Sequence, residues 1–143
     1  MLALAVKDAL LCLIATNIQV ALEEFGDSRQ IFSMHWIALE SEAQLAEIKN
    51  NSTLSLIFKH STRCHISHMV LRSFEKEWNE NANIQTYFLD LLAYPNLSRE
   101  IANIFQVHHE SPQALLIKNG ECIFDASHNE ISAQEILAEA ATN

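Results

Sequence analysis

The residues best suited to chemistry surround Cys64, one of three cysteines in this 143-residue chain. A cysteine reacts as its thiolate, and neighbouring cations favour that charged form. Lys59 and Arg63 precede Cys64, His65 follows it, and no Asp or Glu occurs between residues 59 and 68. The chain as a whole has a formal net charge of −9, so this stretch departs from its surroundings. The pattern favours an activated thiol over a small buried cysteine, which is the ordinary alternative.

Ser67 lies three residues after Cys64, where a dithiol Cys-x-x-Cys enzyme carries its second cysteine. A hydroxyl can donate a hydrogen bond to a thiolate, but it cannot close an intramolecular disulfide. An outside thiol must therefore release whatever Cys64 binds, and the predicted chemistry is monothiol exchange. Ser67 can also cap the helix in which it lies, and both roles can hold together.

Cys64 is expected at the junction of a buried strand and a helix. The apolar run 53–58 predicts the strand, and residues 59–62 predict a polar turn after it. Apolar residues at helical spacing over 66–78 predict an amphipathic helix that begins at or just before the cysteine. The start of a helix adds unpaired amide groups and the positive end of the helix dipole to the surroundings of the sulfur.

The spacing of apolar residues, together with turn and capping residues, predicts the other elements. Asn119-Gly120 is the strongest signal, because this pair is typical of a type I′ turn between two strands. The order β-α-β-α-β-α-β-β-α predicts an α/β fold of the thioredoxin-like kind, with a mixed central sheet and helices on both faces. The further expected strands are 35–39, 84–89, 114–118 and 121–125, and the further helices are 41–49, 95–105 and one that starts at Ser132.

Residues 1–33 are predicted to form an extra N-terminal helix ahead of a domain at 34–143. The apolar stretch 9–22 is about fourteen residues long and contains polar residues, so it is too short and too polar to span a bilayer. Its flanking residues do not match a signal-peptide pattern. We expect a cytoplasmic chain.

Charge and cysteine usage fit a protein of a reducing compartment that does not bind nucleic acid. The acidic balance, with a pI near 5.1, disfavours nucleic acid and anionic membranes as partners. Three cysteines at widely spaced positions do not form a secreted disulfide framework, and they fit a reducing compartment.

Three separated motifs carry a family resemblance. They are Ser61-Thr-Arg-Cys-His-Ile-Ser67, His109-Glu-Ser-Pro-Gln113 and Ala126-Ser-His128. Together they resemble the monothiol bacilliredoxin family of the bacillithiol system, over about residue 34 to the C-terminus. The resemblance implies a thioredoxin-like fold and a thiol-disulfide oxidoreductase that attacks mixed disulfides between protein cysteines and bacillithiol or a similar low-molecular-weight thiol. That thiol is a co-substrate, and no other cofactor is implied.

The resemblance also assigns roles within the motifs. Cys64 is the nucleophile, and Pro112 matches the family's proline that faces the cysteine, where it is expected in cis and the neighbouring backbone pairs with the substrate. We expect Arg63, His65 and Ser67 to assist Cys64. The expected substrate-binding residues are Thr62, His109, Ser111 and Pro112.

His65 departs from the family motif, which usually has proline after the cysteine. An imidazole beside the sulfur can stabilise the thiolate and make the mixed disulfide easier to reduce. It can equally face solvent without effect. The departure leaves the identity of the thiol partner open.

Histidines near Cys64 suggest one alternative, a non-enzymatic metal or iron-sulfur carrier that uses Cys64 with an exogenous thiol. Their spacing matches no recognised ligand pattern, and we predict no metal site. His128 and Cys122 are expected to serve structure and packing. The histidines considered as ligands are His60, His65, His68, His108 and His109.

Overall fold

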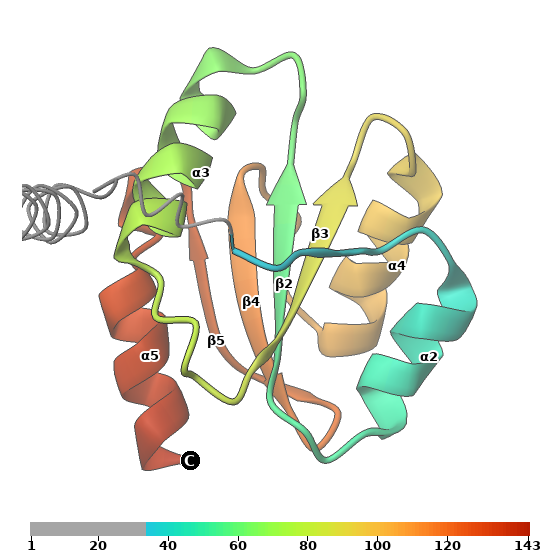
Figure 1. Cartoon of the computed structure of the whole chain (residues 1–143). Helices are drawn as coiled ribbons and strands as arrows, with labels where there is room; N and C mark the ends of the chain where they lie inside the picture. The colour runs from blue at the N-terminus through green and yellow to red at the C-terminus, as the bar shows by residue number, and fades with distance from the viewer. Residues whose placement is uncertain (1–33) are drawn as a thin grey trace, which may run out of the picture. The chain divides into compact units, whose positions relative to one another are not determined.

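The computed structural model describes residues 34–143, so the predicted N-terminal helix at 1–33 lies outside the described residues. The order of elements in the domain is the expected one, with a short 3-10 turn, η1 (His128–Glu130), added before the last helix (Figure 1). The strands are β1 (Ile37–Ala38), β2 (Ser55–His60), β3 (Gln85–Asp90), β4 (Gln113–Lys118) and β5 (Glu121–Ser127). The helices are α2 (Glu42–Asn50), α3 (His65–Glu77), α4 (Pro95–Phe105) and α5 (Ala133–Thr142).

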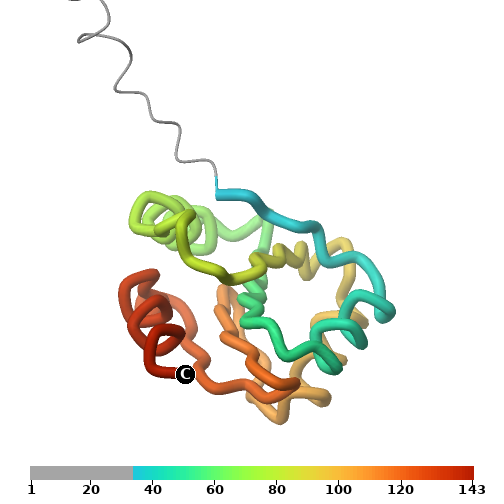
Figure 2. Tube along the Cα trace, turned by 60° about the horizontal axis from the view of Figure 1, so that its bottom comes forward, coloured from blue at the N-terminus to red at the C-terminus, as the bar shows by residue number. Residues whose placement is uncertain are grey.

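The five strands form one mixed sheet in the order β1-β3-β2-β4-β5. Strands β1, β3 and β2 are parallel, whereas β4 runs antiparallel to β2 and β5 runs antiparallel to β4. Helices α3 and α5 cover one face of the sheet, and α2 and α4 cover the other (Figures 1 and 2). In the described part of the chain, no helix has the length and apolar character needed to cross a membrane.

Strand β2 lies at the centre of the sheet and supplies both cores. Alternate side chains of a strand point to opposite faces, so Phe58 packs with Phe74 of α3, while Ile57 belongs to the cluster that contains Ile101 of α4. A strand covered on both faces is apolar on both, which explains the consecutive residues Leu56, Ile57 and Phe58.

The end of β2 corrects the predicted turn. The strand continues two residues beyond the predicted end, and Lys59 is 0% and His60 2% exposed. Their polar side chains suggested a turn, but both residues pair with β3, and Lys59 also pairs with Gln113 of β4. Polar groups can be buried where they have partners, and the partners of these two residues lie in other parts of the chain.

Local capping signals are confirmed. Ser41 is the N-cap of α2 in a full capping box, because its Oγ accepts from the Gln44 amide at 3.3 Å and the Gln44 side chain accepts from the Ser41 amide at 3.1 Å. Helix α4 has the predicted bounds, with Pro95 in its first turn. Ser132 caps α5 and accepts from the Glu135 amide at 3.4 Å.

The hairpin loop is also as predicted. Asn119 and Gly120 both have positive φ, 51° and 75°, as a type I′ turn requires. The loop packs against the end of α2, where Lys49 Nζ donates to the carbonyl oxygen of Gly120 at 2.8 Å. A Cβ atom at position 120 would overlap the carbonyl oxygen of Lys49.

We expect Gly120→Ala to lower the free energy of unfolding by about 1–3 kcal/mol, because the new Cβ meets the backbone of α2 and alanine disfavours positive φ. Asn119→Gly is the matched control, since glycine tolerates the same φ, and it should change that free energy by less than about 1 kcal/mol. Urea denaturation of both variants measures the difference. Equal losses in the two would contradict this account of the turn.

Candidate active site

Cys64 is the N-cap residue of α3, at the end of the loop that follows β2. The Cys64 amide donates to the Ser61 carbonyl at 3.1 Å, and the Cys64 carbonyl accepts from the His68 amide at 3.2 Å, so both backbone groups fix the cysteine at the start of the helix. The first turn of α3 carries no acidic residue, and Cys64 is half-buried. The sulfur therefore lies at the positive end of the helix dipole, as the sequence predicted.

Three neighbours of Cys64 are exposed. Thr62, Arg63 and His65 all lie at the surface, on the loop and the first turn of α3. The Thr62 carbonyl lies 2.9 Å from Nε2 of His68, which ties the loop to the next turn of the helix. Exposed cations at a helix start add to its positive potential, so the geometry retains the basic character read from the sequence.

The Ser67 hydroxyl faces away from solvent and has two partners. Its Oγ accepts from the Ser61 amide at 3.1 Å and lies 2.7 Å from Nδ1 of His60. Within residues 34–143, no hydrogen bond joins it to the Cys64 sulfur. The predicted donation to the thiolate is therefore not formed in this structure, where the hydroxyl instead holds the Cys64 loop.

His60 is buried against α3 and β3. Burial lowers the pKa of its imidazole, and the charge of His68 lowers it further, while Asp90 acts in the opposite direction. The ring packs edge-on against His68, with 4.6 Å between centroids. A neutral imidazole at this position can pair with the Ser67 hydroxyl without bringing a buried charge.

The proline loop lies at the same edge of the sheet as Cys64. Lys59, near the end of β2, pairs with Gln113 at the start of β4, so the residues that follow β2 and those that precede β4 emerge together. The Ser111–Pro112 peptide bond is cis, as expected from the family motif. The Pro112 carbonyl accepts from the His128 amide at 3.0 Å, which ties this loop to the end of β5.

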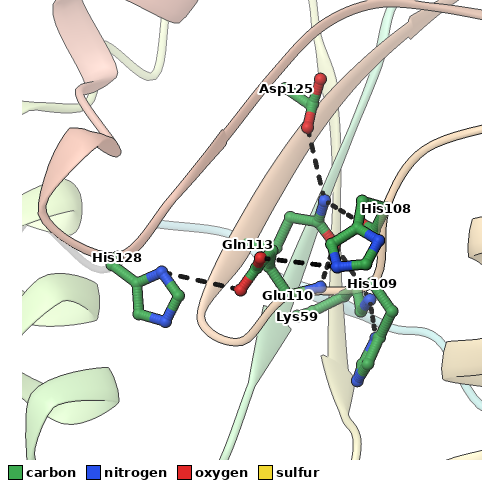
Figure 3. Close-up of polar contacts among 7 residues, drawn as sticks. All are labelled: Lys59, His108, His109, Glu110, Gln113, Asp125 and His128. Carbon is green, nitrogen blue, oxygen red and sulfur yellow. Dashed lines mark hydrogen bonds and ion pairs between the residues drawn. The ribbon is translucent and has the colours of Figure 1, made fainter.

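A polar cluster centres on the buried Lys59 and Gln113 and reaches the exposed His109 in the loop before Pro112 (Figure 3). Nζ of Lys59 lies 2.6 Å from Nδ1 of His109 and donates to Oε1 of Gln113 at 3.0 Å. Gln113 in turn donates from Nε2 to the His108 carbonyl at 2.9 Å and to Oδ2 of Asp125 at 3.4 Å. Burial lowers the pKa of Lys59 to about 8, and the charge of Glu110 opposes the shift.

The comparisons with known proteins agree with this arrangement. A family model described as Monothiol bacilliredoxin BrxC matches residues 37–136. The chain belongs to this family.

Solved structures give the bacilliredoxin-family chain its fold class. A protein described as a proposed oxidoreductase with a thioredoxin fold is 32% identical, with a TM-score of 0.65, over 77% of this chain and 96% of that one. Thioredoxin from Malassezia sympodialis is 16% identical, with a TM-score of 0.58, over 77% of this chain and 96% of its own. Mitochondrial thioredoxin 3 from Saccharomyces cerevisiae is also 16% identical, with a TM-score of 0.58, over 76% of this chain and 95% of its own. The fold is thioredoxin-like.

The bacilliredoxin fold brings together most of the predicted site residues. Two adjacent loops at one edge of the sheet carry them, except that His109 turns its Nδ1 toward the buried Lys59. Ser111 has a buried Oγ that makes no hydrogen bond within residues 34–143. The residues brought together are Thr62, Arg63 and Cys64 of the loop after β2, His65 and Ser67 of the first turn of α3, and Ser111 and Pro112 of the loop before β4.

Sequence reasoning missed the internal roles of Lys59, His60 and Gln113. All three are buried and polar, and each binds a residue of one of the two loops. One signal was present in the sequence, since Lys59 and His60 directly continue an apolar run. Their partners lie on α3 and in the loop before β4, so the spacing of residues along the chain does not identify them.

The remaining predictions concern metal ligands, His128 and Cys122. In the described region, no group of three or more His, Cys, Asp or Glu side chains is placed to hold a metal ion. The side chain of His128 is half exposed, with Nδ1 3.9 Å from the Glu110 carboxylate. Cys122 packs against the core, and burial raises the pKa of its thiol to about 11, with Asp125 adding to the shift. The packing role predicted for Cys122 agrees with this environment.

We expect Ser67→Ala to lower the free energy of unfolding by about 1–3 kcal/mol, because it leaves the buried His60 Nδ1 and the Ser61 amide without their partner. Ser73→Ala removes an exposed hydroxyl from the same helix and should cost less than about 0.5 kcal/mol. Chemical denaturation of both variants tests the assignment. It would be wrong if the two losses were equal.

The stability of the chain should depend on pH through Lys59. Its pKa falls from 10.5 to about 8 on folding, so between these values the unfolded chain binds more protons than the folded chain. Stability therefore rises with pH across this window. Relative to Lys59→Met, the native chain should gain about 2 kcal/mol between pH 8 and pH 10. Denaturation of both proteins at each pH measures the gain, and parallel profiles would contradict it.

Proposed function

We propose that this chain is a monothiol thiol-disulfide oxidoreductase that uses Cys64 to remove bacillithiol, or a similar low-molecular-weight thiol, from protein mixed disulfides in a reducing cytoplasm. The observation that carries the proposal is the placement of one cysteine at the N-cap of α3, with Ser67 where a dithiol enzyme has its second cysteine. Membership of the monothiol bacilliredoxin family supports the same chemistry.

The exchange takes place in two balanced steps. The Cys64 thiolate attacks the sulfur of the small thiol in the mixed disulfide, a new disulfide forms at Cys64, and the substrate cysteine leaves as a thiolate that takes up a proton. A second molecule of the small thiol, as its thiolate, then attacks the adduct. It forms a symmetric disulfide and releases the Cys64 thiolate, so one free small thiol is oxidised for each protein mixed disulfide reduced.

The first step depends on the state of the Cys64 sulfur. The start of α3 supplies its dipole and unpaired amides, and the exposed guanidinium of Arg63 adds positive charge. These groups favour the thiolate that begins the exchange. They also stand where they can attract an anionic small thiol, and His65, in the place of the usual proline, acts on the sulfur or on that thiol.

The second step needs an external thiol because of Ser67. Its hydroxyl is occupied by His60 and the Ser61 amide, and oxygen in place of sulfur cannot form a disulfide with Cys64. Cys122 is an unsuitable substitute, since its raised pKa leaves little thiolate near neutral pH. Release of the adduct from Cys64 therefore requires attack by a thiol from solution.

The proline loop binds the substrate in this proposal. Pro112 stands at the same sheet edge as Cys64, and the backbone that precedes it can pair with the extended chain around a substrate cysteine. The buried hydroxyl of Ser111, which has no hydrogen-bond partner among residues 34–143, and the exposed Thr62 are further candidates for hydrogen bonds to the substrate. Ile66 and Met69, 53% and 59% exposed on α3, offer apolar contact to a protein partner.

Incubation with a protein mixed disulfide of bacillithiol, followed by intact-mass and peptide mass spectrometry, tests the function. We expect the small thiol to move to Cys64 and the substrate to appear reduced. Cys64→Ser should reduce transfer to the uncatalysed rate, because an alcohol is not ionised near neutral pH.

Cys122→Ser is the matched control and should transfer at the native rate. Transfer that survives in Cys64→Ser, or an adduct on another cysteine, would contradict the proposal. Visible absorbance in freshly purified protein that is lost in Cys64→Ser would support the carrier function instead. The same assay with other small thiols identifies the partner.

A further inference from the structure

The last two residues of β2, Lys59 and His60, each bind a residue that holds one of the two loops of the site. Side chains of neighbouring strand residues point to opposite faces of a sheet. His60 points toward α3 and binds Ser67, which holds the loop that carries Cys64. Lys59 points to the opposite face and binds His109, which belongs to the loop that carries Pro112. The end of one strand thus connects both loops.

Burial of Lys59 at this position is energetically unfavourable. Its side chain is 0% exposed, and its two hydrogen-bond partners, His109 and Gln113, are both uncharged. Glu110, the carboxylate whose charge acts on Lys59, directs its own oxygens toward His108 and His128, at 3.9 Å from each (Figure 3). Burial of an amine without a carboxylate costs free energy that an apolar side chain would avoid. This cost indicates a role for the amine beyond packing.

The contacts of Lys59 fasten the proline loop at two points. The first is His109 itself, whose Nδ1 also lies 3.5 Å from the Ser98 hydroxyl of α4. The second is Gln113, whose Oε1 accepts from Lys59 and from the Glu110 amide, at 3.3 Å, while its Nε2 donates to the His108 carbonyl. Residues 108–110 are therefore held by hydrogen bonds that converge on Lys59, directly or through Gln113 (Figure 3).

We propose that Lys59 is a positioning residue for thiol exchange, which holds the loop 108–112 through His109 and Gln113 so that a mixed disulfide bound beside Pro112 meets the Cys64 sulfur in line. This inference rests on the proposed function. Lys59 does not touch the sulfur in this account, because it points toward α4 while Cys64 begins the helix on the other face. Loss of Lys59 should therefore weaken substrate binding and leave the reactivity of the Cys64 thiol unchanged.

The proposal defines the state of His109. When Lys59 donates to Nδ1, the proton of the neutral imidazole must reside on Nε2. The His109 pKa is lowered by burial and by the charge of Lys59, which favours this neutral form. Nitrogen-15 NMR of the imidazole reports the tautomer directly, in the full-length protein and without any substrate.

Lys59→Met is the principal test. We expect the KM for a peptide mixed disulfide of a small thiol to rise about tenfold, since a misplaced loop loses substrate contacts worth about one such factor. The rate at which iodoacetamide alkylates Cys64 should stay within about twofold of native across pH 6 to 9. The NMR spectrum should lose the preference for the Nε2 tautomer of His109, and the Glu110 amide should exchange faster with solvent.

Three further variants separate positioning from general damage. Lys59→Gln keeps a donor at the end of the side chain, and its KM should lie between those of the native chain and Lys59→Met. Lys49→Met removes an exposed lysine at the opposite edge of the sheet and should leave KM and the His109 spectrum unchanged. The double variant Lys59→Met with His109→Phe should have no higher KM than the worse single variant, since both break the same connection.

The outcomes are distinct. A fall in Cys64 alkylation that parallels the loss of transfer would show that Lys59 acts on the thiol, and it would overturn the proposal. An unchanged KM or an unchanged His109 tautomer in Lys59→Met would overturn it as well. If the native chain transfers no small thiol, the proposed function fails, while the His109 tautomer and the Glu110 exchange rate still decide whether Lys59 holds the loop. If Lys59→Met does not fold, Lys59→Gln provides the same measurements, and His109→Phe provides KM, the alkylation rate and the Glu110 exchange rate.

Discussion

The antiparallel pairing of β2 with β4 brings the two halves of the site together. Cys64 follows the end of β2 and Pro112 precedes the start of β4, so this register places both loops at one edge of the sheet. The last pair in the ladder, Lys59 with Gln113, is polar and fully buried. A buried polar pair is tolerated only when its groups are hydrogen-bonded, so the fold must supply partners at this edge. The partners it supplies are in the loops themselves.

Much of the fold could be predicted because its signals are local. The capping box at Ser41, the first-turn proline of α4 and the Asn119-Gly120 turn each specify their own conformation, and the structure has all three. The end of β2 could not be placed this way. Lys59 binds a residue fifty positions later in the chain, and a polar side chain gives no sign of a partner so distant. The sequence therefore read as a turn where the strand continues.

The Cys64 loop and the Pro112 loop of the candidate site could be predicted from the sequence to different extents. Position at a helix start and basic neighbours identified Cys64 from the residues alone. The cis bond before Pro112 followed from the family motif, since no local pattern requires it. The partner of the Ser67 hydroxyl depends on a rotamer and on the buried His60, neither of which spacing reveals. The site side chains are therefore easier to identify than the hydrogen bonds that hold them.

The close approach of Gly120 to Lys49 fastens the hairpin to α2 at the edge of the sheet farthest from Cys64. In the proposed function, thiol exchange takes place at the other edge, and the apolar strands lie between the two. Substitutions at the far edge should therefore alter how much protein a cell retains more than what that protein reacts with.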